Sequence, residues 1–197
     1  MPIIATRASA AYGAGFGKGA SGGGFAGPFG SFDSLATVSL TSTTNTVTFA
    51  GIPSNYRHLQ LRMANLSSGQ DNYVILRFNG VADTYYGVHQ IDANGSGTPT
   101  FSQAGNPVTF AGGGYTATAA YPTVAIVDIF DYSVYNTMKS VRALHGSSRN
   151  ADLSYMGVIS SGWQVPNPIQ QIEVIHGNIA GGKVFNANSH FALYGVK

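Results

Sequence analysis

The segment RHLQLRMANL (residues 57–66) decides the fold class, because apolar and polar residues alternate along most of it. Leu59, Leu61 and Met63 fall on one side of an extended chain, and the polar residues between them fall on the other. A period of two residues is typical of a β-strand with one face buried. The segment therefore predicts a strand that covers an apolar core.

Other short β-like runs precede and follow this segment, separated by Gly, Asn, Pro and Ser. They span residues 35–41, 46–51, 72–80, 86–92, 123–132, 138–148, 153–163, 169–178 and 189–197. The first two flank STTN (42–45), which predicts a hairpin, and Asn79-Gly80 is a strong turn signal. The run TVAIVDIFDY (123–132) is apolar on both faces, which predicts a central strand buried from both sides.

No segment combines a 3.6-residue apolar period with helix caps, so the sequence predicts an all-β protein. About ten short strands with turn residues between them indicate an antiparallel β-sandwich with a jelly-roll-like topology. The composition changes near residue 34. We therefore expect an extended Gly-rich N-terminal arm (1–34) and one sandwich domain (35–197).

Charged residues make up only 9% of the 197 residues, whereas about 25% is usual in soluble domains. Such a surface suits burial in an assembly or exposure outside a cell. The net charge of +2 is scattered, so the basic stripe of a nucleic-acid-binding protein is missing. The chain has no cysteine, no signal-peptide pattern and no apolar stretch as long as a membrane helix, so no membrane insertion is expected.

The arm contains AYGAGFGKGASGGGFAGPFG (11–30), in which nine of twenty residues are glycine. Residues 15–20 match the G-x-G-x-x-A pattern of dinucleotide-binding loops. That loop needs a strand before it and a helix after it, and SGGGFAGPFG (21–30) cannot form a helix interior. Gly19 after Lys18 also excludes a Walker A loop, so no nucleotide cofactor is expected.

Aromatic residues are spaced singly along the arm. Glycine lets a backbone follow a neighbouring surface closely, while each ring fills a pocket. We therefore interpret the arm as a docking segment for a partner protein. Its predicted anchors are Tyr12, Phe16, Phe25, Phe29 and Phe32.

Candidate catalytic and metal-binding residues are sparse. The five histidines form no closely spaced pair, and each lies alone on an expected strand. Asp128 and Asp131 are near in sequence, but an offset of three places them on opposite faces of a strand. We expect no catalytic residue, no metal site and no cofactor.

Several aromatic residues in turn-rich regions could stack on sugar rings if they are exposed. These candidate glycan contacts are Tyr85, Tyr86, Tyr115, Tyr121 and Trp163. The alternative for the same residues is packing in the core or at the rim of the sandwich.

Three motifs resemble those of a group of tailed-bacteriophage virion proteins. They are IPSNYRHLQLR (52–62), RFNG (77–80) and the closing strand FALYGVK (191–197). The resemblance is clear towards the ends of the chain and weak in the middle, where residues 95–120 match nothing. It implies a β-sandwich mounted on a phage particle, and it carries no active site with it.

These observations favour a non-enzymatic virion protein, assembled in the host cytoplasm and anchored to other virion proteins of the capsid, neck or tail by its arm. A homo-oligomer is expected, with a trimer by analogy of fold. The alternative is a host-surface carbohydrate-binding adhesin of the tail or fibre. A polysaccharide depolymerase is the weakest hypothesis, because carboxylates are scarce.

Overall fold

A computed structural model of residues 1–197 gives the fold of the chain. The structure describes residues 32–68, 74–81, 86–93, 100–106, 109–112, 122–148, 154–177 and 182–197. For residues 86–87, 100–106, 109–112, 148 and 154–155 it describes the backbone alone. The anchors predicted at Tyr12, Phe16, Phe25 and Phe29 lie outside the described residues.

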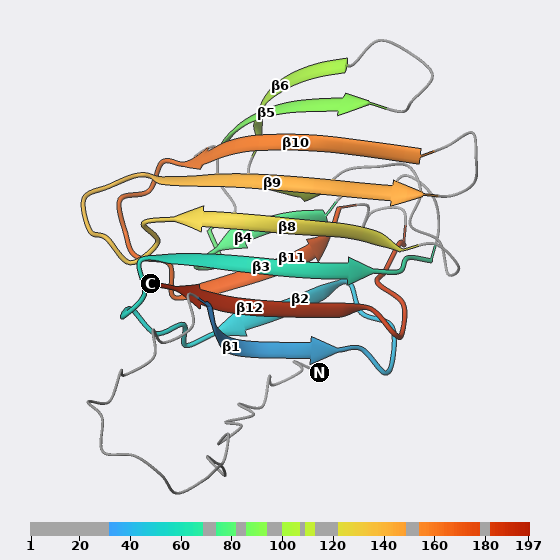
Figure 1. The fold of residues 1–197 in the computed structure, drawn as a ribbon, viewed down its shortest axis with the longest axis horizontal. Coiled ribbons are helices and arrows are strands. Elements are labelled where there is room, and N and C mark those ends of the chain that lie inside the picture. The colour runs from blue at the N-terminus through green and yellow to red at the C-terminus, as the bar shows by residue number, and fades with distance from the viewer. Residues whose placement is uncertain are drawn as a thin grey trace, which may run out of the picture.

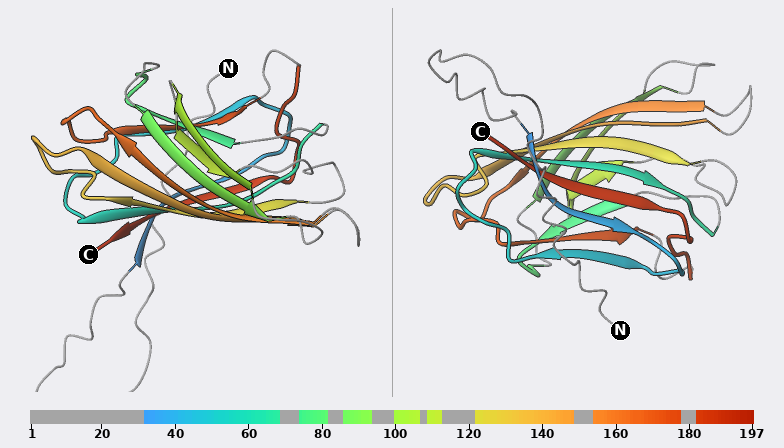
Figure 2. Two further views of the ribbon diagram at one scale, coloured as in Figure 1. Left: turned by 90° about the horizontal axis from the view of Figure 1, so that it is seen from above. Right: turned by 60° about the horizontal axis from the view of Figure 1, so that its bottom comes forward.

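In the described residues, twelve strands form two antiparallel sheets, which face each other as two layers (Figures 1 and 2). The large sheet has the order β1 (Phe32–Ser39), β12 (His190–Val196), β3 (His58–Asn65), β8 (Thr123–Phe130), β9 (Lys139–Ser148), β10 (Ser154–Trp163), β5 (Tyr86–Ala93), β6 (Thr100–Asn106). The small sheet has the order β2 (Thr46–Ala50), β11 (Gln171–His176), β4 (Val74–Phe78), β7 (Thr109–Gly112). The described residues contain no helix, and the predicted antiparallel β-sandwich is confirmed.

The strand pairing is nested along the chain. β1 pairs with β12, β2 with β11, β3 with β8 and β4 with β7, all antiparallel. The remaining strands, β9, β10, β5 and β6, extend the large sheet beyond β8. The large sheet is therefore wider than the small sheet that covers it.

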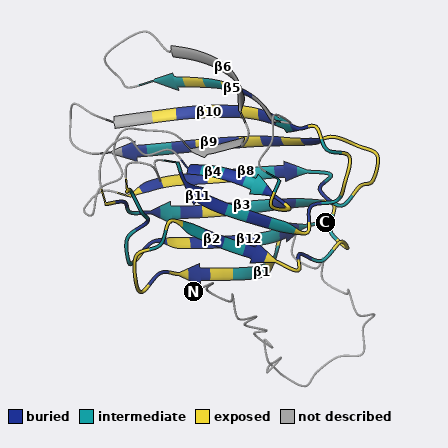
Figure 3. Ribbon diagram, turned by 180° about the vertical axis from the view of Figure 1, so that it is seen from behind, coloured by how far each residue is buried: buried dark blue, intermediate teal, exposed yellow. Residues whose placement is uncertain are grey.

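The core lies between the two sheets and is built by alternation along the strands (Figure 3). Leu59, Leu61 and Met63 of β3 point inward and are buried, as the sequence predicted. Trp163 of β10 meets Phe78 of β4 edge to face, with ring centroids 5.5 Å apart, so this pair joins the two layers.

The Asn79-Gly80 turn signal is also confirmed. Both residues have positive φ (53° and 71°), and the Val81 N–H donates to the Phe78 carbonyl, as in the mirror-image turns that this dipeptide favours. The Asn79 side chain also accepts from the backbone N–H groups of Gln170 and Gln171. One side chain therefore holds the turn and the approach to β11 together.

Three expectations from the sequence are corrected. The strands on either side of STTN do not form a hairpin, because β1 joins the large sheet and β2 the small one. The strand at 123–132 is buried on one face only, since Val124 and Ile126 are exposed. The first strand begins at Phe32 rather than Leu35. In addition, β6 and β7 lie within residues 95–120, where no strand was predicted.

Nothing in the described part of the chain is a helix long and apolar enough to cross a membrane.

Candidate functional site

The outer surface of the large sheet carries a group of exposed apolar side chains. Strand alternation directs Ala125 and Val127 of β8 into the core, so Val124 and Ile126 point outward. The same phase exposes apolar residues on β9, β10 and β5. We name the set the outer apolar face: Ile91 (47% exposed), Val124 (51%), Ile126 (44%), Leu144 (51%), Met156 (59%) and Val158 (44%).

Strand register makes this face continuous. Ile126, Leu144 and Val158 lie side by side on β8, β9 and β10, and Ile91 of β5 follows Val158 in the same row. Cross-strand neighbours on one face have Cβ atoms about 4.5–5.5 Å apart. The side chains therefore form one apolar patch across four strands rather than scattered exposed residues.

An open groove of about 590 Å³ runs along part of this patch. Small residues form part of its lining: Ala64 on β3, Ala192 on β12 and Gly146 on β9. Leu144 and Met156 rise beside them. Such a lining can accept large apolar side chains and offers few polar groups to a charged ligand.

The edge of the groove is formed by Arg62 and two aromatic rings. The Arg62 guanidinium lies 5.1 Å from the Phe32 ring centroid and 4.8 Å from that of Tyr194, within cation–π range. Its Nε donates to Gln60 Oε1 at 2.7 Å. Phe32, the predicted arm anchor whose side chain the structure describes, is 43% exposed and contacts Arg62 at the edge of the groove.

A polar row separates the outer apolar face from the end of the sheet at which β1 begins. Asp128 accepts from Gln60 Nε2 at 2.8 Å and pairs with the Arg142 guanidinium at 2.9 Å. Asp131 pairs instead with Arg57 at 3.0 Å. Each carboxylate is therefore paired with an arginine of its own, Asp128 with Arg142 and Asp131 with Arg57. Such ion pairs are typical of structural contacts between strands and loops.

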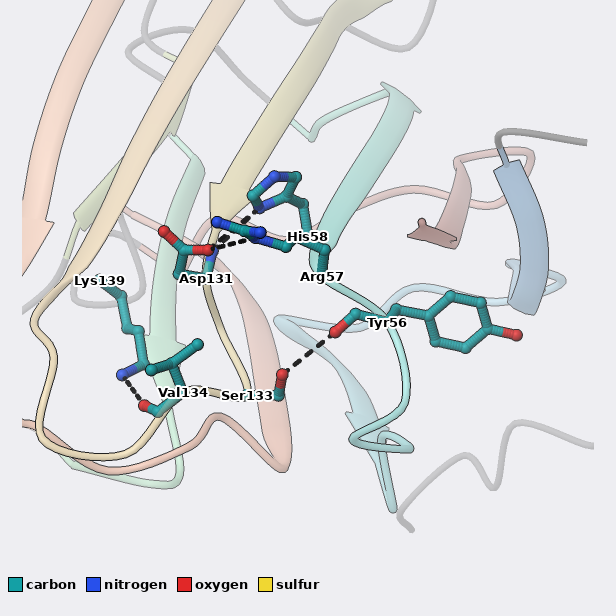
Figure 4. A network of polar contacts seen from close by, with 7 residues as sticks. All are labelled: Tyr56, Arg57, His58, Asp131, Ser133, Val134 and Lys139. Atoms are coloured by element: carbon teal, nitrogen blue, oxygen red, sulfur yellow. Dashed lines mark hydrogen bonds and ion pairs between the residues drawn. The ribbon is translucent and has the colours of Figure 1, made fainter.

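A second polar network surrounds Asp131 and the turn between β8 and β9 (Figure 4). The Asp131 N–H donates to His58 Nδ1 at 3.0 Å, and Ser133 Oγ donates to the Tyr56 carbonyl at 3.1 Å. Lys139 is buried, and its Nζ donates to the Val134 and Thr137 carbonyls. Burial lowers the pKa of Lys139, whereas the charge of Asp131 acts in the opposite direction.

In this network the ammonium group of Lys139 donates its hydrogen bonds to backbone carbonyls. Its role is therefore to hold the β8–β9 turn in place. Tyr56 and His58 belong to the IPSNYRHLQLR motif, so two residues of that motif act here in packing and hydrogen bonding.

A third group of polar residues is buried between the sheets, at the end where β3 finishes. His145 Nε2 lies 3.3 Å from Asp92 Oδ1. Asn65 and Thr123 are opposite each other in register and are both buried. Burial lowers the pKa of His145, and the carboxylate of Asp92 opposes that shift. Within the described residues, no group of three His, Cys, Asp or Glu side chains could hold a metal ion.

Of the five predicted glycan contacts, the structure describes the side chain of Trp163 alone. Tyr85, Tyr115 and Tyr121 lie outside the described residues, and for Tyr86 only the backbone on β5 is described. Trp163 is a correction: its side chain is fully buried against Phe78, so it presents no face to a sugar.

The sequence interpretation missed the outer apolar face. The sequence of residues 123–132 already showed apolar residues on both faces of the strand. The prediction placed both of those faces in the core. The structure covers one of those faces with the small sheet and leaves the other exposed. Comparisons of the chain with known protein families, curated proteins and solved structures give no match.

Proposed function

We propose that this chain is a non-enzymatic structural protein of a tailed-bacteriophage particle. The β-sandwich forms a knob, and the arm (1–34) fastens it to other virion proteins of the capsid, neck or tail. The observation that carries the proposal is the outer apolar face, six exposed apolar residues in register on one sheet. Contiguous apolar patches of this kind mark interaction surfaces.

The sequence of β8 supports the same interpretation. A strand that is apolar on both faces is usual where both faces are covered. In the isolated chain the small sheet covers one face, and a partner would cover the other. Removing apolar surface from water contributes about 25 cal/mol per Å², so the face favours association.

The resemblance to phage virion proteins is the reason for proposing that the chain assembles on a phage particle rather than in another kind of complex. The nested strand pairing also supports a jelly-roll topology, which we include in the proposal. Without β5, β6, β9 and β10, the sheets reduce to β1-β12-β3-β8 and β2-β11-β4-β7. That is a double-sheet arrangement of eight strands, as in capsid jelly rolls.

Self-association into a homo-oligomer, with a trimer as the expected state, belongs to the same proposal. The glycan-binding adhesin remains an alternative, now without Trp163. Its remaining candidates are tyrosines whose side chains the structure does not describe.

The test is incorporation into particles. Full-length chain carrying Leu144→Asp is supplied during phage assembly, and its copies per purified particle are counted by quantitative mass spectrometry. A carboxylate in the middle of the outer apolar face should lower incorporation at least tenfold, because the charge would have to be desolvated at the interface.

Ser160→Asp is the matched control. It places the same charge on the same sheet face, in the polar row beside Arg142, and should leave incorporation unchanged. Deletion of residues 1–30, which leaves β1 complete, tests the arm separately. Normal incorporation of the Leu144→Asp chain would exclude the face as the docking surface, and normal incorporation of the deleted chain would exclude the arm as the anchor.

A further inference from the structure

The turn between β8 and β9 exposes a second group of apolar side chains. Residues 132–138 (YSVYNTM) contain no charged side chain. Tyr135 is 69% exposed, Met138 64% and Val134 41%, and we name these three side chains the apolar tip. Large apolar side chains grouped on a protein surface mark sites of interaction. The apolar tip is therefore a candidate contact surface, separate from the outer apolar face.

Hydrogen bonds hold the apolar tip in one conformation. The Asn136 N–H donates to the Pro166 carbonyl at 2.9 Å, and the Val134 N–H donates to the Asp131 carbonyl at 3.1 Å. Buried Lys139 donates from Nζ to the Val134 carbonyl (Figure 4). Asp131 and Asn136 have positive φ (50° and 58°), which Asp and Asn tolerate better than most residues. A surface that is fixed before binding loses less conformational entropy on binding, so the tip suits a preformed groove.

The groove on the outer apolar face matches the apolar tip in chemistry and size. It is lined mainly by Ala, Val, Ile, Leu, Met and Gly residues, so an uncharged tip can enter it without desolvating a charge of its own. Its volume of about 590 Å³ lies in the range of about 300–1,000 Å³ that binding pockets have. Arg62 and His190 also line it and offer hydrogen-bond partners to the Tyr135 hydroxyl, which needs one when its ring is buried.

The apolar tip cannot reach the groove of its own chain. Figure 1 shows the turn between β8 and β9 beyond one end of the large sheet, whereas β8 begins at the other end. Val124 and Ile126 line the groove and lie about 20 and 13 Å along β8 before Phe130, at roughly 3.3 Å per residue. The tip follows Phe130, and its hydrogen bond to Pro166 keeps it at that end. Only another molecule can therefore fill the groove with this tip.

We infer that the apolar tip of one copy lies in the groove of a second copy. This inference rests on the proposed function, in which the outer apolar face is an interaction surface, and it names the occupant of the groove. The two surfaces differ, so the contact is heterologous and repeats head to tail, which closes into a ring or continues as a filament. A closed ring of three copies is the expected trimer. Packing two outer apolar faces against each other would leave both tips in water.

The test uses single cysteines, because the natural chain has none. One full-length chain carries Met138→Cys in the apolar tip, and another carries Met156→Cys in the groove. The two are mixed at submillimolar concentration with a short bifunctional maleimide, and dimers are mapped by mass spectrometry. Dimers joined between residues 138 and 156 should be at least tenfold more abundant than dimers from either chain alone.

Ser160→Cys in place of Met156→Cys is the matched control. Ser160 is exposed on the same face of β10, about 13 Å from Met156, and does not line the groove, so the yield should fall to background. Adding Tyr135→Ala to the Met138→Cys chain should lower the yield with Met156→Cys at least fivefold. Its urea unfolding midpoint should stay unchanged, because Tyr135 is exposed.

Three results would overturn the inference. Equal or higher yield from the Met156→Cys chain alone would show packing of two outer faces, and from the Met138→Cys chain alone it would show packing of two tips. Background yield in every sample would show that copies make no such contact. A yield that Tyr135→Ala leaves unchanged would exclude the tip as the contact surface as well.

Particle incorporation separates this inference from the proposed function. Cross-links between tip and groove, together with normal incorporation of the Leu144→Asp chain, would refute docking through the outer apolar face and leave the contact between copies. Lowered incorporation of Leu144→Asp without cross-links between tip and groove would refute only the contact between copies.

Discussion

His145 of β9 and Asp92 of β5 meet across the strand that lies between them, with Nε2 of the histidine 3.3 Å from Oδ1 of the aspartate. The contact spans β10 because position 157, which is opposite both residues in register, is glycine. A Cβ at Gly157 would lie 2.1 Å from Asp92 Oδ1 and 2.4 Å from His145 Nε2. The absence of a side chain at Gly157 leaves room for buried His145 to contact Asp92, whose side chain is 25% exposed.

Gly157→Ala should therefore lower the free energy of unfolding by about 1–3 kcal/mol, the usual range for overpacking a filled site. Urea denaturation followed by far-ultraviolet circular dichroism measures the change. Gly162→Ala on the same strand is the control, because its Cβ would meet nothing closer than the Lys139 carbonyl at 3.8 Å. Equal losses in the two variants would contradict the assigned contact.

Gly195 supports a second close contact, with the ring of Tyr56. A Cβ at position 195 would lie 2.5 Å from Tyr56 Cγ and Cδ1, so Gly195→Ala should also cost about 1–3 kcal/mol of stability. In a chain that already carries Tyr56→Ala, the same substitution should cost much less. A double-mutant cycle by urea denaturation measures this coupling, and a coupling energy of zero would refute the contact.

His176 predicts a loss of stability in mild acid. Its ring is buried and bonded to Ser67 Oγ at 2.9 Å. Burial, and to a smaller extent the charge of Lys183, lowers its pKa to about 4. The unfolded chain, with a histidine pKa near 6.5, takes up the proton first as the pH falls.

Stability that is present above pH 6.5 should therefore be lost as the pH falls from about 6.5 to about 4, by up to about 3 kcal/mol. His145, whose pKa is also lowered, adds a loss of the same sign. Urea midpoints between pH 4 and 8 measure the slope. His176→Gln should flatten it. An unchanged slope in His176→Gln would exclude His176 as its source.

Trp163 predicts a spectroscopic signature, since it is the single tryptophan and is fully buried. Its emission should be blue-shifted and resist quenching by iodide in the folded protein, and both properties should be lost in denaturant. Trp163→Ala should cost about 3–5 kcal/mol. Tyr135→Ala, at a residue 69% exposed, should stay within about 0.5 kcal/mol. Iodide quenching equal in folded and unfolded protein would contradict the burial.

Alternation along the chain was sufficient to predict strands and, for residues 57–66, which side chains enter the core. Leu59, Leu61 and Met63 alternate with polar residues, so only one phase buries apolar surface. The Asn79-Gly80 turn could also be predicted from the sequence. The turn needs positive φ at two successive residues, and Asn followed by Gly is one of the few pairs that adopt it easily.

Pairing partners could not be read locally. β1 and β2 are consecutive in the chain, yet they belong to different sheets. Each pairs with a strand from the other end of the chain, β1 with β12 and β2 with β11, and no local pattern identifies those partners. β6 and β7 contain Gly, Ser, Thr and Asn, whose side chains carry little apolar periodicity. Their strands are apparent only from the neighbours with which they pair.

The sequence by itself determined that this protein is all-β, that its strands are short, and that β8 offers two apolar faces. Only the tertiary structure decided which of those faces the small sheet covers, because Val124 and Ile126 are as apolar as Ala125 and Val127. The same limit applied to Trp163, since β10 has apolar residues in both phases. Which face of a strand is buried depends on how the two sheets pack. The local sequence predicts the buried face only when the other face of the strand is polar.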